Sequence, residues 1–496
     1  MWVDNFILLV PAIIVFVGAS ALMLVSATKN FGLMTSAIVA NVFLGVAALV
    51  QFFQMGSLYS VGAEGGLFHG MFIADTFSGF VCLIVIVCGM VTNSMSTSYF
   101  ATNNFHRLEY NALVLFAVFG MMLMSMAGEL VTIFVVLEIM SLSVYVLIGM
   151  NRTNSNATEA VFKYLMLGAF AGAFFVMGAA FIYGATGTTV ISEISTYVSA
   201  HAGESMPFLV AGITLILIAL FFKVAAFPMH AWTPDVYDGA AMPVTGFMAT
   251  GVKAASFAVM LRLFMVDFLD VQEIWVGPVS VVAILTLFAG NFLAMAQDNV
   301  KRMLAASGIV HSGYLLIGIA SLSMTGNAAA SVLFYLAAYA IGSLGVFAAL
   351  SYLTGQGEKR ITFDDFNGLA KKHPFVAAVI ALFMLSFVGF PPTIGFIAKF
   401  YLFTSAVEAG NIWLAVFGII SSVVSIYYYL RLIVAMYFKP ATEEFDVCAC
   451  TSCAKYASGI MAFATIWGGI GTMTLVIFPS ATTLMASAIL GIQSLF

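Results

Sequence analysis

Long runs of apolar residues, separated by short polar segments, fill this chain from end to end. A helix needs about 20 apolar residues to cross the hydrocarbon core of a bilayer. Fourteen runs of roughly this length occur, at 6–28, 33–54, 72–98, 109–127, 129–150, 159–184, 207–238, 240–266, 275–296, 301–322, 329–354, 374–409, 412–438 and 457–478. The pattern predicts an all-α integral membrane protein with about fourteen transmembrane helices.

Composition supports this prediction and leaves little room for a soluble domain. The chain is 62% hydrophobic and 8% charged, whereas soluble domains carry roughly 25% charged residues. The longest polar segment is the short stretch before His373, so no nucleotide or redox-cofactor domain fits, and we expect no cofactor and no nucleic-acid partner. The first run follows only Asp4 and lacks the basic residues of a signal peptide, so we expect a retained helix.

Basic residues fall on alternate sides of the predicted runs, which predicts the orientation in the membrane. Cytoplasmic loops are enriched in Lys and Arg. Loops after odd-numbered runs carry Lys29, Arg107, Arg152, Lys301, Arg302, Lys359, Arg360, Lys371, Lys372, Lys439 and Lys455. Loops after even-numbered runs carry Glu64, Glu193, Glu204, Asp267, Asp270 and Glu273. We therefore expect both termini outside the cytoplasm of a prokaryotic cell, with Arg262 as the one basic residue at the wrong end.

Charged residues inside the runs are the strongest functional signal. They are Glu138, Lys223, Lys253, His311 and Lys399. A charge at the bilayer centre costs roughly 2.5–3.5 kcal/mol, so five unpaired groups would cost about 15 kcal/mol. We therefore expect them to face one another or water inside the bundle. They form either a proton pathway or a set of structural ion pairs.

Two further groups are possible accessories. Lys163 lies only about one turn inside its run, so its stem can reach the cytoplasmic interface. His230 follows Pro228 in a polar turn and is either a hydrogen-bonded turn residue or a proton relay.

Proline interrupts two runs that are too long for a single span, at Pro228 and at Pro391–Pro392. Proline ends or kinks a helix, and broken helices at membrane depth line cavities or ion pathways. The breaks are five runs apart, which predicts two inverted five-helix repeats. The expected division is an N-terminal three-helix segment at 1–108, repeats at 109–274 and 275–440, and a C-terminal loop and helix at 441–496.

The motifs around these charges resemble the antiporter-like subunits of respiratory complex I. The matching segments are VTIFVVLEIMSLSVYVL with Glu138, FKVAAFPMHAWTPDVYDGAAMPV with Lys223 and His230, TGVKAASF with Lys253, and GFPPTIGFIAKFYLF with Lys399. Among these subunits the chain resembles subunit N, or its archaeal counterpart in the F420H2 dehydrogenase.

The resemblance implies a proton path without a redox centre on this chain. This chain would move protons while neighbouring subunits pass electrons to quinone or methanophenazine. Its partners would be other membrane subunits, among them a second antiporter-like subunit and small subunits. Glu138 would modulate Lys223, the switching donor. Lys253 and His311 would form the central relay, and Lys399 the exit gate. A multisubunit sodium/proton antiporter and a non-conducting membrane scaffold remain alternative functions.

A cluster of cysteines occurs near the C-terminus, at Cys448, Cys450 and Cys453. Thiolates at this spacing can bind a metal ion, but no fourth ligand lies nearby in the sequence. We expect no metal site.

Overall fold

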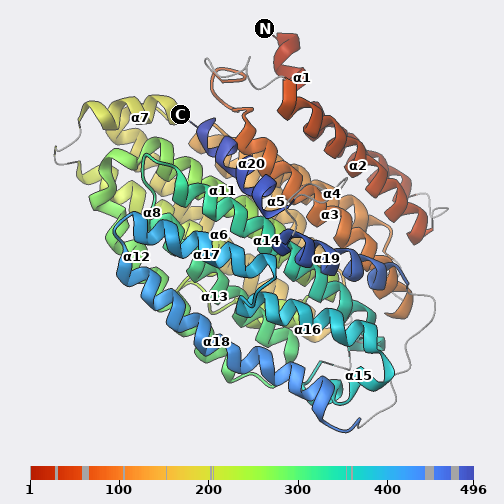
Figure 1. The fold of residues 1–496 in the computed structure, drawn as a ribbon. Coiled ribbons are helices and arrows are strands. Elements are labelled where there is room, and N and C mark those ends of the chain that lie inside the picture. Colours follow the sequence, from red (N-terminus) through yellow and green to blue (C-terminus); the bar gives the residue numbers. More distant parts are fainter. Residues whose placement is uncertain are drawn as a thin grey trace.

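The structure is a computed structural model, and the residues that it describes fold into a bundle of helices (Figure 1). These residues are 2–27, 32–57, 66–103, 107–151, 154–201, 204, 206–353, 355–358, 361–441, 452–470 and 480–495. They form twenty α-helices, and their only β pairing consists of isolated bridges. The predicted all-α class is confirmed.

The first six helices follow the predicted runs closely. They are α1 (Trp2–Ser26), α2 (Leu33–Ser57), α3 (Thr76–Asn103), α4 (Glu109–Met126), α5 (Leu130–Ile148) and α6 (Ser155–Thr186). Polar side chains fasten α2 to its neighbours, because Asn41 donates to Ser94 of α3 at 3.1 Å and Asn111 of α4 donates to Ser36 at 3.0 Å. Such interhelical hydrogen bonds hold helices together where the hydrophobic effect cannot.

The next stretch contains the first predicted break. After the short α7 (Ile191–Ala200), α8 (Pro207–Lys223) ends five residues before Pro228, and the chain resumes as α9 (Thr233–Gly239). The freed backbone N–H of Phe227 donates to the hydroxyl of Thr286 at 2.9 Å. A neighbouring helix therefore satisfies the backbone that the proline leaves open.

A single long span follows this break. It consists of α10 (Met242–Phe247), the π-helical η1 (Met248–Val252), α11 (Lys253–Arg262) and the π-helical η2 (Leu263–Asp267). The 3₁₀ turn η3 (Leu269–Val271) joins it to α12 (Gln272–Met295), which is followed by α13 (Val300–Ala320) and α14 (Asn327–Leu353). In the most apolar window of each helix, 94% of the residues of the first span, 100% of those of α13 and 94% of those of α14 are buried. These three elements form the centre of the bundle.

The second predicted break separates two short helices of the C-terminal third. The elements here are η4 (Gln356–Glu358), η5 (Asp364–Phe366), α15 (Leu369–Lys372), α16 (Pro374–Val388), α17 (Ile394–Glu408), α18 (Ile412–Phe438), α19 (Ser452–Ile470) and α20 (Ala481–Gln493). The break lies between Val388 and Ile394, around Pro391 and Pro392. Both helix interruptions that the prolines predict are thus confirmed. The short α20, which the apolar runs did not predict, packs on α3 and α14.

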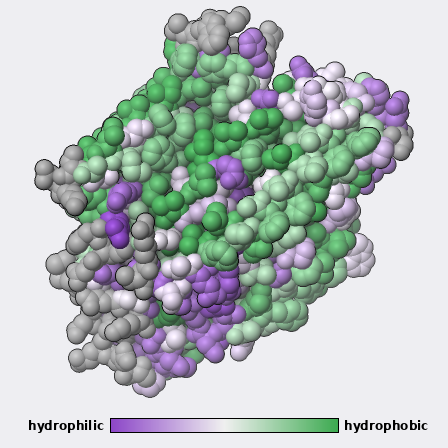
Figure 2. All heavy atoms as spheres, turned by 180° about the vertical axis from the view of Figure 1, so that it is seen from behind, coloured by the Kyte–Doolittle hydropathy of each residue, from purple (hydrophilic) through white to green (hydrophobic). Residues whose placement is uncertain are grey.

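The outer surface of the bundle is apolar, as a lipid-facing surface must be. Figure 2 shows hydrophobic side chains in a broad band across one face, with polar residues gathered toward its edges. Eleven helices of the described residues are long and apolar enough to cross a membrane, and α8, α16 and α20 are shorter apolar helices. The exact count of fourteen spans and the division at 108, 274 and 440 stay predictions.

Candidate functional site

Four basic side chains lie in the interior of the bundle, where charge is expensive. Lys223, Lys253 and His311 are each 3% exposed, and Lys399 is 5% exposed. They come from α8, α11, α13 and α17, so both broken helices and the buried centre contribute. The structure brings together the four basic residues that the sequence placed at mid-membrane depth.

Lys223 is the last residue of α8, directly before the first break. Its Nζ donates to the hydroxyl of Ser141 on α5 at 2.7 Å. Ser141 lies three residues after Glu138, and no ion pair joins Glu138 to Lys223 in the part of the chain that the structure describes. A hydroxyl is thus the hydrogen-bond partner of the ammonium group, and Glu138 acts on it electrostatically from farther away. The role of Glu138 as modulator of Lys223 stays a prediction.

Glu138 is half-buried between α5 and α6. Its carboxylate lies against Gly172 of α6, where an added Cβ would stand 3.3 Å from Oε1. The missing side chain at Gly172 makes room for the carboxylate between the two helices. Glu138 therefore marks the α5–α6 edge of the group of buried charges.

Lys253 connects the central span to α13. Its Nζ donates to the carbonyl of Gly308 at 2.5 Å and stands 5.2 Å from the ring centre of Tyr339. The hydroxyl of Ser312 also contacts the Gly308 carbonyl, at 3.2 Å, and donates to the carbonyl of Val224 at 2.6 Å. Hydrogen bonds thus link the break after Lys223 to the partner of Lys253.

His311 lies one turn farther along α13, between two phenols. Its Nδ1 is 2.7 Å from the hydroxyl of Tyr335, and its Nε2 is 3.2 Å from the hydroxyl of Tyr429. Tyr429 also bonds to the hydroxyl of Ser307. A histidine held between hydroxyl groups at both nitrogens can take up a proton on one side and release it on the other.

Lys399 lies beyond the second break but reaches back across it. Its Nζ donates to the carbonyl of Val388, the last residue of α16, at 3.0 Å and to the hydroxyl of Ser422 at 2.7 Å. The ammonium group also stands 4.7 Å from the ring centre of Tyr314. The end of a helix leaves carbonyl groups unpaired, and Lys399 satisfies one of them inside the bundle.

His311 and Lys399 both line one small cavity of about 10 Å³, which is close to the least volume that can hold a water molecule. Tyr335, Tyr339 and Ser386 contribute polar atoms to its lining. Water in such a polar cavity can carry protons between groups that do not touch. We call Lys223, Lys253, His311 and Lys399 the row of buried basic groups. The cavity lies between its last two members.

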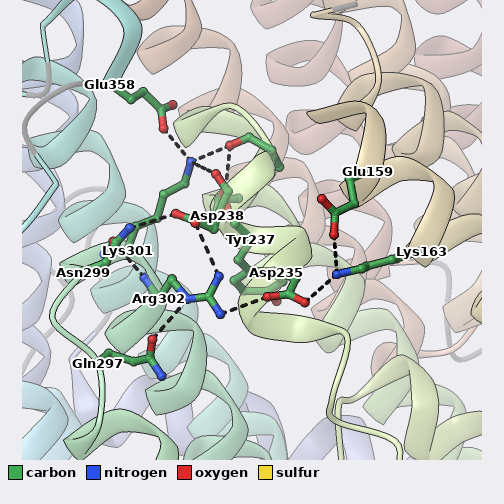
Figure 3. A network of polar contacts seen from close by, with 12 residues as sticks. Glu159, Lys163, Asp235, Tyr237, Asp238, Gln297, Asn299, Lys301, Arg302 and Glu358 are labelled. Atoms are coloured by element: carbon green, nitrogen blue, oxygen red, sulfur yellow. Dashed lines mark hydrogen bonds and ion pairs between the residues drawn. The ribbon is translucent and has the colours of Figure 1, made fainter. Parts of the chain in front are cut away.

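The two accessory candidates lie apart from this row. Lys163 pairs with Glu159 at 2.7 Å and with Asp235 at 2.8 Å, and its side chain is 38% exposed (Figure 3). His230 is half-buried and stacks on Phe227, with ring centres 5.5 Å apart. Neither is hydrogen-bonded to the four buried basic groups.

Asp235 lies at the centre of the polar network in Figure 3, between Lys163 and Arg302. Partial burial acts to raise the pKa of this carboxyl, but hydrogen bonds from the two basic groups outweigh burial and hold its pKa below the ordinary value. The carboxylate therefore stays ionised at neutral pH and anchors α9 to α6 and α13.

Sequence reasoning missed two buried ion pairs. Arg262 pairs with Asp75, directly before α3, at 2.9 Å and donates to the carbonyl of Ser125 at 2.9 Å. Lys301, expected in a loop, lies in the first turn of α13 with a fully buried side chain and pairs with Glu358 at 2.6 Å. The violation of the orientation rule by Arg262 was the one available signal. Nothing in the sequence indicated the burial of Lys301.

The cysteine cluster can be followed only in part, because Cys448 and Cys450 lie outside the described residues. Cys453 is half-buried with a free thiol. The described residues contain no group of three or more His, Cys, Asp or Glu side chains that could hold a metal ion.

Comparisons with known proteins agree with the resemblance seen in the motifs. Residues 127–425 match the model of the NADH:quinone oxidoreductase/Mrp antiporter transmembrane family. The chain is 41% identical to the NADH-quinone oxidoreductase subunit N of Trichlorobacter lovleyi, over 94% of each chain. It is 42% identical to subunit N of Myxococcus xanthus, over 88% of this chain and 90% of the relative.

Solved structures show the same fold. A chain of respiratory complex I from Thermus thermophilus is 30% identical, with a TM-score of 0.76 over 93% of this chain and 98% of that chain. A chain of the Mrp complex from Dietzia sp. is 20% identical and aligns over the whole of both chains with a TM-score of 0.83. The second likeness shows the fold alone.

Proposed function

The chain belongs to the family of NADH-quinone oxidoreductase subunit N, and from this premise we propose that it is a proton-translocating membrane subunit of a respiratory dehydrogenase complex. It couples electron transfer in other subunits, from NADH or a comparable donor to quinone or methanophenazine, to the movement of protons. The proposal places it in the cytoplasmic membrane of a prokaryote, with both termini outside, beside other membrane subunits that include a second antiporter-like chain.

One observation supports proton transport over a structural role. Lys223, Lys253 and Lys399 each donate to neutral oxygens, from a hydroxyl, a carbonyl, or both. By contrast, the buried Arg262 has a carboxylate partner within 3 Å. An arginine paired in this way keeps its proton, whereas a lysine among neutral acceptors can exist with or without the extra proton. The scaffold alternative would need these three lysines to be paired with carboxylates as Arg262 is.

The row has an order in which each member can act. Glu138 senses or sets the charge state of Lys223 from a distance, since no ion pair within the described residues fixes either group. The Val224–Ser312–Gly308 hydrogen bonds carry the connection to Lys253. These groups titrate as a coupled set rather than one by one.

The second half of the row leads toward the exit. His311 exchanges protons between the hydroxyls of Tyr335 and Tyr429, and the shared cavity leads from it to Lys399. Moving one charge across a membrane costs about 2.3 kcal/mol per 100 mV. Placing an unpaired charge at the bilayer centre costs a comparable amount, about 2.5–3.5 kcal/mol. Switching of one group is thus of the right size to drive a pump.

The test is redox-driven proton uptake by the purified complex in liposomes. Lys253→Met removes the charge but keeps most of the side-chain volume, so we expect assembly and electron transfer with reduced pumping. Arg431→Gln, which breaks an exposed pair with Asp298, is the matched control and should pump normally. Normal pumping by the assembled Lys253→Met complex would argue for the scaffold. Pumping that requires sodium ions would argue for the antiporter alternative.

A further inference from the structure

Lys301 is a buried basic group that the row described above does not include. Its side chain is fully buried, and its three donors are all used (Figure 3). Nζ donates to the carbonyls of Asp238 and Ala240, at 3.0 and 2.5 Å, and to Oε2 of Glu358 at 2.6 Å. The group therefore has no direct route to solvent except past these partners.

Glu358 supplies that route. Its side chain is 14% exposed, and its second oxygen accepts the backbone N–H of Met242 at 2.8 Å. The backbone of Glu358 has φ +51°, a conformation that non-glycine residues seldom adopt. Strain of this kind is often found where a side chain must be held in one place for function. The carboxylate is thus fixed to Lys301 through one oxygen and to the backbone of Met242 through the other, in a side chain that stays partly exposed.

The position of Lys301 on α13 connects it to the row of buried basic groups. Gly308, whose carbonyl accepts a hydrogen bond from Lys253, lies seven residues farther along the same helix. This separation is about 10.5 Å at 1.5 Å per residue. His311 follows one turn later. One straight helix thus carries the Glu358 partner at one end and the acceptor of Lys253 near its middle.

Hydroxyl groups lie near both ends of this stretch. Thr245 shares the carbonyl of Ala240 with Lys301, at 3.5 and 2.5 Å, and donates to the carbonyl of Tyr237 at 2.9 Å. At the other end, the ring centre of Tyr339 stands 5.2 Å from Nζ of Lys253. A hydroxyl group thus lies beside Lys301, and a phenol lies beside Lys253.

We propose that Glu358 and Lys301 form the cytoplasmic inlet through which protons reach Lys253, an inference that rests on the proposed function. Glu358 takes a proton from cytoplasmic water. Lys301 passes one of its protons inward along the hydroxyl groups and becomes a neutral amine. The O–H bond of Glu358 then breaks, a new N–H bond forms on Lys301, and the ammonium group is restored. Each cycle moves one proton inward and returns both side chains to their starting state.

The comparison with Arg262 and Asp75 shows what separates this pair from a structural one. In that pair the carboxylate is 9% exposed and the base is an arginine, which keeps its proton at all accessible pH values. In the Glu358 pair the acid reaches solvent and the base is a lysine, which can release a proton. The chemistry of a relay is present in the second pair and absent from the first.

Among the residues that the structure describes, other ionisable groups near the inlet lie on α3, α9 and α13. Tyr99 of α3 bonds to Glu358. Asp238 of α9 pairs with Arg302 of α13 at 3.5 Å rather than with Lys301, which contacts only its carbonyl. A pH dependence that disappears with Glu358→Gln can therefore be assigned to the carboxyl group itself.

The experiment compares Glu358→Gln and Glu358→Asp with Asp298→Asn in the whole complex. Glutamine can still accept from Lys301 and Met242 but leaves the buried ammonium group without its counter-charge. A structural role therefore predicts lower thermal stability and, in the complexes that assemble, unchanged pumping. A positioned proton-transfer group contributes about 10²-fold or more to its step, so we expect Glu358→Gln to lose this subunit's pumping while electron transfer continues. The loss should deepen as the cytoplasmic pH rises, and Glu358→Asp should restore pumping. Asp298, 88% exposed in a surface pair on the same side, serves as the control and should have no effect.

Lys301→Arg keeps the ion pair but cannot release a proton, so it should also lose pumping. Wild-type pumping and pH profile in Glu358→Gln or Lys301→Arg would overturn the inlet, as would a failure of both variants to assemble. The Lys253→Met variant distinguishes a failure of the inlet from a failure of the proposed function. If it stops pumping while Glu358→Gln pumps normally, the inlet is wrong and the proposed function stands. Normal pumping by Lys253→Met would refute the proposed function itself.

Discussion

Lys399 and Ser422 both donate to the carbonyl of Val388, at 3.0 and 3.1 Å, and so close the free end of α16 from two sides. Lys399 also donates to Ser422, at 2.7 Å. The three groups form a triangle at the second helix break. If Lys399 loses its proton, Ser422 can still donate to the carbonyl of Val388. This arrangement lets the lysine become neutral without leaving a buried carbonyl unpaired.

The first prediction concerns Ser422. Ser422→Ala removes one of the two partners of Lys399 and the second donor to Val388. A lost hydrogen bond of this kind costs about 1 kcal/mol, so the complex should assemble with slightly lowered thermal stability. Pumping should fall more than electron transfer, since the weaker N–H donor of the neutral Lys399 amine is then the remaining side-chain donor to Val388. Ser280→Ala on α12, whose hydroxyl bonds only within its own helix, is the control; equal pumping in both variants would refute the idea.

The second prediction concerns Glu138, which acts on Lys223 across a distance rather than through an ion pair. Glu138→Gln removes the charge, and a one-unit change in the pKa of a partner corresponds to about 1.4 kcal/mol, or tenfold in proton transfer. We expect Glu138→Gln to slow pumping by roughly that factor and Glu138→Asp to retain most of it. Glu193→Gln on α7, where the carboxylate bonds to Thr188, should pump at the wild-type rate. Full pumping by Glu138→Gln would remove Glu138 from the mechanism.

The third prediction concerns the stability of the bundle. Arg262→Ala leaves Asp75 buried without its counter-charge, which costs about 3–5 kcal/mol. The variant complex should therefore unfold at a lower temperature or lose this subunit on purification. The double variant Arg262→Met with Asp75→Leu should recover much of the loss, because neither charge remains. Arg431→Ala, in an exposed pair, should change stability by about 0–1 kcal/mol. A single Arg262→Ala variant as stable as the wild type would show that the pair contributes nothing.

Much of the architecture could be predicted from the sequence, since lipid imposes a simple pattern. Apolar runs predicted the helices, and prolines predicted both breaks, because the missing N–H of proline ends a helix wherever it falls. The cost of buried charge also identified Lys223, Lys253, His311 and Lys399 as residues that must meet in the interior. These inferences use only local properties of the chain.

The contacts of these groups could not be predicted, because they depend on how distant helices pack. The expected partner of Lys223 was Glu138, but Ser141, one turn farther on the same helix, lies closer. Lys301 looked like an ordinary loop residue, since its burial arises from Glu358, which is distant in the sequence. Periodicity and composition contain no information on which of several nearby polar groups is the closest.

The central claim is that the buried lysines work by releasing and regaining protons, and Lys399→Arg tests it most directly. Arginine keeps the charge and can donate to Val388 and Ser422, but it is effectively always protonated. Redox-driven pumping would be measured in assembled complexes carrying Lys399→Arg or Lys399→Ala, with electron transfer followed in the same samples. The account predicts that both variants transfer electrons and that arginine fails to restore pumping. Full pumping with arginine and none with alanine would show that the site needs only a fixed positive charge, and would contradict the account.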